Sequence, residues 1–190
     1  RVLGAEVKDV PLKSDYSFDC DALEREFLDN GKMIVICSPN NPTGNFIPLE
    51  RVERLLQLSS QPVVIDEAYF EFSGKTAAGL LSKYDNLIVL RTFSKAFSLA
   101  GLRLGYGLMA SELAVELNKA KLPYNINFFT IAAAIKLLEK KDELRKTVEI
   151  IIKERDRMIP EINTIPDVKA YPSDANFFIM ETPYSPAAVF

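Results

Sequence analysis

The sequence predicts an α/β fold, in which a doubly wound, mostly parallel sheet is flanked by helices and followed by the start of a smaller α+β domain. Three observations predict it. Short apolar runs of strand length alternate with segments whose apolar residues recur at helical spacing. The apolar runs are continuous rather than alternating, which is typical of strands in a parallel sheet. Beyond a long helical segment, the pattern changes to short strand-like pieces.

Four apolar runs are expected to form the sheet, and the first of them is expected to be buried on both faces. They are residues 32–37 (KMIVIC), 62–66 (PVVID), 86–91 (NLIVLR) and 104–109 (LGYGLM). One helix is predicted to begin at Pro48, and three more are predicted over residues 112–120, 127–140 and 142–159. The last of these helices carries an apolar stripe, made of Leu144, Val148, Ile151, Ile152 and Ile159. Two short strands are predicted at residues 168–171 and 176–180.

The same pattern divides the chain into parts. Residues 1–141 are expected to form a large domain, residues 142–160 a linking helix, and residues 161–190 the start of a C-terminal small domain. The chain opens without an initiator methionine or a signal peptide. We therefore expect the middle of a longer protein, with the large domain incomplete at its N-terminus and the small domain truncated.

Composition limits the chemistry. The 190 residues include no histidine, which excludes Ser-His-Asp and Cys-His catalysis and metal sites that need imidazole, and we expect no metal. The net charge of −3 gives no reason to expect nucleic acid or an anionic membrane as a partner. No apolar run approaches the ~20 residues that span a bilayer. The two cysteines, Cys20 and Cys37, provide no disulfide framework and are consistent with a reducing cytoplasm.

Polar clusters follow three of the predicted strands, and open α/β sheets bind ligands at the carboxyl ends of their strands. The first cluster is SPNNPTG, residues 38–44, which is either a turn or a rigid loop whose two asparagines could present a fixed amide to a ligand. The second contains Asp66, Glu67 and Tyr69. Acidic residues at a strand end also occur in P-loop nucleotidases, which need a GxxxxGK[ST] motif upstream of that strand. The only GKT in the sequence, residues 74–76, lies downstream of Asp66 and lacks the first glycine of the motif, so this class is excluded.

The third cluster is TFSKAFSLAGLRLGYG, residues 92–107. The glycines in this segment do not form the GxGxxG pattern of dinucleotide-binding folds. Thr92 and Ser94 flank Lys95, and Arg103 follows eight residues later. Hydroxyl groups with an arginine form a site for a dianionic phosphate, and a lysine beside them can form a Schiff base with a carbonyl ligand. The alternative is an ordinary solvated helix start.

Taken together, the three clusters resemble one family. Asn41, Asp66, Tyr69, Lys95 and Arg103 occur in the order and approximate spacing of the class I/II, fold-type I, pyridoxal-phosphate-dependent aminotransferases. DEAYFEF, FSKAFSLAGLRLGY and SDANFF are similar to the histidinol-phosphate aminotransferases within that family. Aromatic-amino-acid aminotransferases and threonine-phosphate decarboxylases share nearly all of these motifs. An aminotransferase-like domain of a transcription regulator and an inactive homologue are further alternatives.

The resemblance implies roles for the cofactor-binding residues. Lys95 would hold pyridoxal 5′-phosphate as a Schiff base and then shuttle the substrate proton, and Asp66 would pair with the pyridine nitrogen. Tyr69 and Asn41 would hydrogen-bond the 3-oxygen of the cofactor. The phosphate would be held by three further residues, Thr92, Ser94 and Arg103.

The resemblance also implies substrate contacts and partners. Tyr124 and Asn125, in LPYN, would lie near the active site, and Asn176, in SDANF, near the substrate carboxylate. A helix cap with a packed aromatic ring is the other interpretation of LPYN. The implied substrates are an amino acid and a 2-oxo acid, with L-histidinol phosphate and 2-oxoglutarate as the expected pair. The family's sites are completed across a homodimer, so a homodimer is expected.

Overall fold

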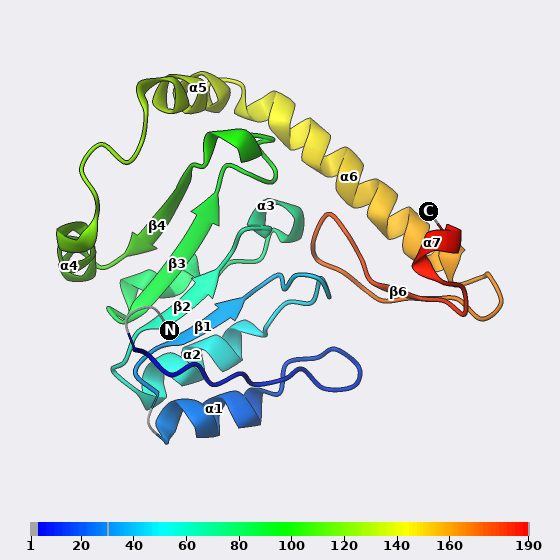
Figure 1. Ribbon diagram of the computed structural model, residues 1–190, viewed down its shortest axis with the longest axis horizontal. Coiled ribbons are helices and arrows are strands. Elements are labelled where there is room, and N and C mark those ends of the chain that lie inside the picture. Colours follow the sequence, from blue (N-terminus) through cyan, green and yellow to red (C-terminus); the bar gives the residue numbers. More distant parts are fainter. Residues whose placement is uncertain (1–3, 30, 190) are drawn as a thin grey trace.

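A computed structural model describes residues 4–29 and 31–189 (Figure 1). In chain order the main elements of the large α/β part are α1 (Cys20–Leu28), β1 (Ile34–Cys37), α2 (Leu49–Leu58), β2 (Val63–Asp66), α3 (Phe70–Ser73), β3 (Leu87–Thr92), β4 (Gly105–Met109), α4 (Ser111–Ala120) and α5 (Phe128–Leu138). Two short 3-10 helices accompany them, η1 (Ala78–Ser82) and η2 (Ala100–Leu102). The C-terminal elements are α6 (Lys141–Ile162), β5 (Lys169–Ala170), β6 (Met180–Glu181) and α7 (Pro186–Val189).

The four predicted strands form one sheet in the order β1-β2-β3-β4. The first three strands are parallel, and β4 runs antiparallel to β3, so the prediction of a mostly parallel sheet is confirmed. Asp66 lies opposite Cys37 on β1, and Thr92 lies opposite Gly105 at the start of β4. The carboxyl ends of the first three strands and the amino end of β4 therefore meet at one edge of the sheet. All three polar clusters follow this edge.

One face of the sheet packs against α1 and α2, which lie side by side below it in Figure 1. Alternate residues of the strands point to this face because side chains alternate across a strand. The core that results consists of buried apolar residues from both layers: Phe27, Ile36, Ile47, Val52, Leu55, Leu56, Val63, Ile65, Ala77, Leu87 and Val89. The packing of α2 follows from its sequence, since Val52, Leu55 and Leu56 recur at helical spacing on one side. This core makes the strand ends a rigid platform.

The prediction that the first strand is buried on both faces is wrong for the described chain. Val35, in the middle of β1, is 59% exposed, whereas Ile36 is buried. The physical reason is the position of β1 at the edge of the sheet, where only one of its faces meets the helices. The central strand β2 does match the prediction, because Val63, Val64 and Ile65 are all buried.

The long helix α6 runs from α5 past the strand ends to the C-terminal hairpin (Figure 1). It ends at Ile162, three residues beyond the predicted end at residue 159, so Pro160 lies in its last turn. Beyond it, β5 and β6 pair as a small antiparallel sheet. A second apolar cluster joins these parts, because Ala175 and Val148 pack with Tyr69, Phe72 and Ala96 from the strand-end loops. The predicted domain division stays a prediction.

Both cysteines are free thiols, as the absence of a disulfide framework predicted. Burial raises the pKa of the Cys37 thiol at the end of β1. None of the helices in the described part of the chain combines the length and the apolar character needed to cross a membrane.

Candidate active site

Asp66 and Tyr69 lie at and just after the end of β2, and they differ in burial. Asp66 is the last residue of the strand, and its Oδ1 accepts a hydrogen bond from the Ala68 amide at 3.0 Å. This contact closes a turn that brings Tyr69 to the start of α3, where it is only 5% exposed. The Asp66 carboxylate is half-buried, so it lies at the strand-end edge within reach of a ligand.

The SPNNPTG segment forms a turn in which the two adjacent asparagines have different partners. Asn40 holds the turn, because its backbone carbonyl accepts from the Gly44 amide at 2.7 Å and its side-chain Nδ2 donates to the Thr43 hydroxyl at 2.8 Å. Asn41 points elsewhere: its Nδ2 donates to the Tyr69 hydroxyl at 2.8 Å, across 28 positions of sequence. The turn interpretation is therefore confirmed at Asn40, whereas the presentation of an amide to a ligand by Asn41 stays a prediction.

Lys95 joins this pair from β3. The strand ends at Thr92, whose Oγ1 accepts from the Ser94 amide at 3.1 Å and so turns the chain towards Lys95. The Lys95 side chain is exposed, and its Nζ lies 5.2 Å from the centroid of the Tyr69 ring. Three predicted residues from three different strand ends, Asn41, Tyr69 and Lys95, thus form one cluster.

Arg103 lies at the same edge, although it precedes β4. The Phe93 amide donates to the Leu104 carbonyl at 3.0 Å, which places the start of β4 beside the end of β3. Arg103 has φ 52° and Ser98 has φ 55°, a left-handed conformation that costs residues other than glycine of order 1 kcal/mol or more. Such strain is concentrated at functional sites. The exposed Arg103 guanidinium donates to the Ala100 carbonyl at 3.1 Å and has further N–H groups to offer an anion.

Glu67, next to Asp66, has a structural role that its position in the sequence did not reveal. Its side chain is fully buried and accepts four hydrogen bonds, from Thr76 Oγ1 (2.8 Å), the Ala77 amide (2.6 Å), and Arg91 Nε (3.1 Å) and Nη2 (2.9 Å). The Arg91 guanidinium also stacks on the Phe70 ring, 3.6 Å from its centroid. The pair joins the segment after β2 to β3, and so keeps Asp66 and the Thr92–Lys95 turn in register.

We expect Glu67→Gln to destabilise the fold by about 3–5 kcal/mol, because Arg91 would keep its charge in a largely buried place without a counter-ion. Urea unfolding followed by circular dichroism measures this change. Glu53→Gln is the matched control, since the Glu53 ion pair with Lys83 is largely exposed and such pairs contribute ~0–1 kcal/mol. Equal losses of stability in the two variants would show that the buried pair has no special weight.

The remaining predicted residues are not all brought to this edge. Tyr124 is 99% exposed with φ 59°, and Asn125 is also exposed. They lie in the connection from α4 to α5, which passes on the opposite side of the sheet from β6 in Figure 1. Among the described residues, neither side chain forms a hydrogen bond with the cluster. Asn176 is exposed as well, but its neighbour Phe177 packs edge-on against Tyr69, with ring centroids 4.9 Å apart.

Arg155 is a contact of the site region that the motifs did not indicate, and Phe177 lies in the SDANFF motif without having been singled out. Arg155 interrupts the apolar stripe of α6, because it lies four residues after Ile151 and four before Ile159. Its side chain is only 10% exposed. An arginine in register with an apolar helix face is therefore a signal in the sequence that could have identified it.

Comparisons with known proteins show the family of the chain. Residues 1–187 match the family described as aminotransferase class I and II. The histidinol-phosphate aminotransferase of Thermoanaerobacter pseudethanolicus is 42% identical over 182 residues, which are 95% of this chain and 52% of that protein. The chain thus spans about half the length of the curated relatives it matches.

Two solved structures are similar over most of the chain. The histidinol-phosphate aminotransferase of Sinorhizobium meliloti, in complex with pyridoxal-5′-phosphate, has a TM-score of 0.80 at 30% identity, covering 90% of this chain and 48% of that one. A decarboxylase from Sulfurospirillum multivorans has a TM-score of 0.76 at 32% identity, covering 95% and 55%. The match over nearly the whole chain, on a sheet whose strand ends carry the motif residues, shows that the chain belongs to the class I and II aminotransferase family.

Proposed function

We propose that this chain is the cofactor-binding part of a pyridoxal-phosphate-dependent aminotransferase. The observation that carries the proposal is the meeting of Asn41, Tyr69 and Lys95: the amide donates to the tyrosine hydroxyl at 2.8 Å, and the lysine amine lies 5.2 Å from the centre of the same ring. The exposed amine of Lys95 could bind the carbonyl group of a ligand, and the buried phenol of Tyr69 could hydrogen-bond an acidic oxygen on the same ligand.

The donor set of this edge fits each polar group of pyridoxal phosphate. Lys95 offers an amine to the aldehyde, and Asp66 offers a carboxylate to the ring nitrogen. Because Asn41 donates to the Tyr69 oxygen, the tyrosine hydrogen remains to be donated to the cofactor's 3-oxygen. Among residues 4–29 and 31–189, no hydrogen bond is found in which that hydroxyl donates. The phosphate would meet Arg103 and the hydroxyls of Thr92 and Ser94.

When bound, the cofactor supplies an electron sink for the electrons left on the substrate α-carbon. The chain's own residues would do the rest. Lys95 Nζ would take the proton from the α-carbon and return it during product formation, which is general acid–base work without histidine. The Asp66 carboxylate would hold a proton on the ring nitrogen, and its contact with the Ala68 amide orients it for that task. Tyr69 and Asn41 would hold the ring by one edge.

Phosphate binding would depend on the turn after β3. Thr92 Oγ1 accepts from the Ser94 amide, which keeps both hydroxyl groups on one short turn. Arg103 supplies a planar fork that suits bidentate contact with a phosphate. Its place beside this turn follows from the antiparallel pairing of β4, which begins opposite Thr92.

For the reaction, we propose the exchange of the amino group between L-histidinol phosphate and 2-oxoglutarate, with imidazole acetol phosphate and L-glutamate as products. Support comes from the relatives named histidinol-phosphate aminotransferase at 42–44% identity. Decarboxylation is the second candidate, because a solved decarboxylase is similar over 95% of the chain. Asn176 is proposed to lie near the substrate carboxylate, and Tyr124 and Asn125 near the site in the assembled enzyme.

We further propose a homodimer in the cytoplasm. The helix α5 and the connection before it expose large apolar side chains, with Leu122 at 74%, Phe128 at 76% and Phe129 at 79%. Exposed apolar surface of this kind is typical of protein–protein contacts. The free thiols Cys20 and Cys37 are consistent with a reducing compartment. We also propose the domain division: a large domain over residues 1–141, a linking helix over residues 142–160 and a small domain over residues 161–190.

The experiment that tests the reaction is a substrate panel on the natural protein loaded with pyridoxal phosphate. We expect 2-oxoglutarate-dependent formation of L-glutamate with L-histidinol phosphate as donor, faster than with aromatic amino acids. Release of CO₂ from threonine phosphate without a 2-oxo acid would favour the decarboxylase instead. Failure of borohydride to attach the cofactor covalently to the chain would contradict the proposed cofactor chemistry altogether.

A further inference from the structure

The C-terminal segment 173–177 is held against the strand-end loops by contacts on several sides. On one side it meets the SPNNPTG loop, because the Asp174 amide donates to the Gly44 carbonyl at 2.7 Å. Gly44 has φ +75°, and a side chain there would come within 2.1 Å of Ser173 Oγ. Only glycine allows this approach, so the loop that carries Asn41 is shaped to receive the segment.

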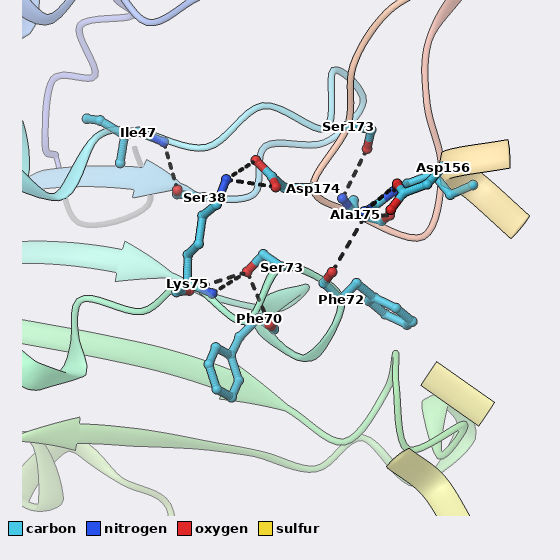
Figure 2. A network of polar contacts seen from close by, with 11 residues as sticks. Ser38, Ile47, Phe70, Phe72, Ser73, Lys75, Asp156, Ser173, Asp174 and Ala175 are labelled. Atoms are coloured by element: carbon cyan, nitrogen blue, oxygen red, sulfur yellow. Dashed lines mark hydrogen bonds and ion pairs between the residues drawn. The ribbon is translucent and has the colours of Figure 1, made fainter. Parts of the chain in front are cut away.

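The second side of the segment meets the region around α3. Lys75 Nζ contacts both carboxylate oxygens of Asp174 at 2.9 Å, and Figure 2 shows this side chain reaching up to Asp174. Phe177 packs against the Tyr69 ring. Ala175 is fully buried between these contacts.

Arg155 joins the segment to α3 from the long helix. Its Nη1 donates to the Ala175 carbonyl at 2.9 Å and to the Phe72 carbonyl at 3.5 Å, and Figure 2 shows both residues in one polar network. Its Nε and Nη2 contact Asp156 Oδ1 at 2.8 Å, which fixes the plane of the guanidinium. One buried cation thus holds two carbonyls, one from the helix that follows Tyr69 and one from the residue before Asn176.

We propose that Arg155 is a positioning residue for substrate binding: it docks segment 173–177 on the turn that carries Tyr69, and so fixes Asn176 beside the candidate site. This inference rests on the proposed function, in which Tyr69 contacts the cofactor and Asn176 lies near the substrate. The candidate cofactor residues Asp66, Thr92 and Lys95 belong to β2, β3 and the turn after them, and none of the hydrogen bonds of Arg155 reaches them.

Because Arg155 contacts segment 173–177 but not Asp66, Thr92 or Lys95, its loss should affect substrate binding more than cofactor binding. Loss of the guanidinium leaves the carbonyls of two buried residues, Phe72 and Ala175, without a charged donor, which loosens the docked segment. Asp66 and Thr92 keep their own contacts, whereas Tyr69 loses part of its packing against Phe177. Arg155→Met is therefore expected to raise the KM for 2-oxoglutarate, the substrate of the proposed pair that carries a carboxylate, roughly 10-fold, the effect of one lost charge-assisted hydrogen bond, while the Kd for pyridoxal phosphate changes much less.

The chain contains a matched control. Arg157 lies on the same helix, is half exposed, and within the described part of the chain pairs with Glu154 and Glu161, one turn away. Arg157→Met removes the same side chain from α6 but should leave both KM and Kd unchanged. Arg155→Lys keeps the charge but lacks the fork, so its KM should fall between those of the parent and of Arg155→Met.

The experiment uses the natural protein with its cofactor and measures kcat and KM for 2-oxoglutarate with L-histidinol phosphate as the amino donor, the Kd for pyridoxal phosphate by absorbance titration, and hydrogen exchange by mass spectrometry. In Arg155→Met we expect faster exchange in peptides covering residues 173–177, and no change there in Arg157→Met. A lower unfolding midpoint in Arg155→Met with kcat, KM and exchange all unchanged would overturn the inference and leave a purely structural arginine.

A double-variant cycle adds a second, independent measurement. If Lys75 and Arg155 hold the same segment, releasing one makes the other less important, so the effects of Lys75→Met and Arg155→Met on KM should combine to less than their product. Fully multiplicative effects would contradict a shared role. If the parent protein binds the cofactor covalently but the variants show none of these changes, this inference alone is wrong. If the parent protein binds no cofactor, the proposed function is wrong instead.

Discussion

Lys95→Ala is expected to abolish turnover and covalent cofactor attachment together. The amine is the only group of the Asn41–Tyr69–Lys95 cluster that can both bind a carbonyl and carry a proton at the α-carbon. Loss of positioned acid–base catalysis alone costs roughly 10²–10⁴-fold, and loss of the covalent step adds to it. Steady-state assays measure the rate, and mass spectrometry after borohydride reduction measures attachment.

Lys83→Ala serves as the control for this change. Its side chain is 62% exposed, and its amine contacts Glu53 at 3.4 Å on the surface of the molecule. Borohydride should leave the cofactor on this variant at a single site, as in the parent protein. Normal turnover by Lys95→Ala, or cofactor trapped on it in equal yield, would remove Lys95 from the proposed mechanism.

Asp66→Asn is expected to produce the second large effect. Asparagine has nearly the same shape and keeps an oxygen for the Ala68 amide, so the turn at the end of β2 should survive. What it loses is the negative charge that would hold a proton on the ring nitrogen. A charge pair at ~4 Å and an effective dielectric constant of ~20 is worth ~4 kcal/mol, which corresponds to roughly 10³-fold in rate.

The measurement for Asp66→Asn is the exchange of the substrate α-hydrogen with deuterium, followed by NMR. This rate isolates the step that depends on the electron sink from later steps such as product release. The exposed Asp85 provides the control, because Asp85→Asn removes one carboxylate from a surface position. Asp66→Asn with the parent's exchange rate would refute the role assigned to this carboxylate.

Two adjacent acidic residues, Asp66 and Glu67, show where prediction from sequence succeeds and where it stops. The position of Asp66 after a buried apolar strand was sufficient to place it at the edge formed by the strand ends, because strand ends are set by local apolar pattern. Nothing local separates it from Glu67. The difference arises from Arg91, 24 positions away, whose guanidinium captures the second carboxylate in the interior.

The helices and strands were predictable for the same local reason. The four strands and α2, α4, α5 and α6 lie within a few residues of their predicted bounds. The burial of β1 was not predictable, since an apolar run reads the same in the middle of a sheet as at its edge. The stripe of α6 was predicted, whereas the task of Arg155 within that stripe depends on two carbonyls that lie 83 and 20 positions away.

The sequence by itself therefore determined the order of the elements, the family resemblance and the group of residues at the strand ends, because periodicity and turn chemistry are properties of neighbouring residues. Only the tertiary structure decided that Asn41 donates to Tyr69, that Lys95 lies over the same ring, and that segment 173–177 closes on both. These contacts join parts of the chain far apart in sequence, and they exist only once the packing of the sheet and of α6 has fixed the distances between them.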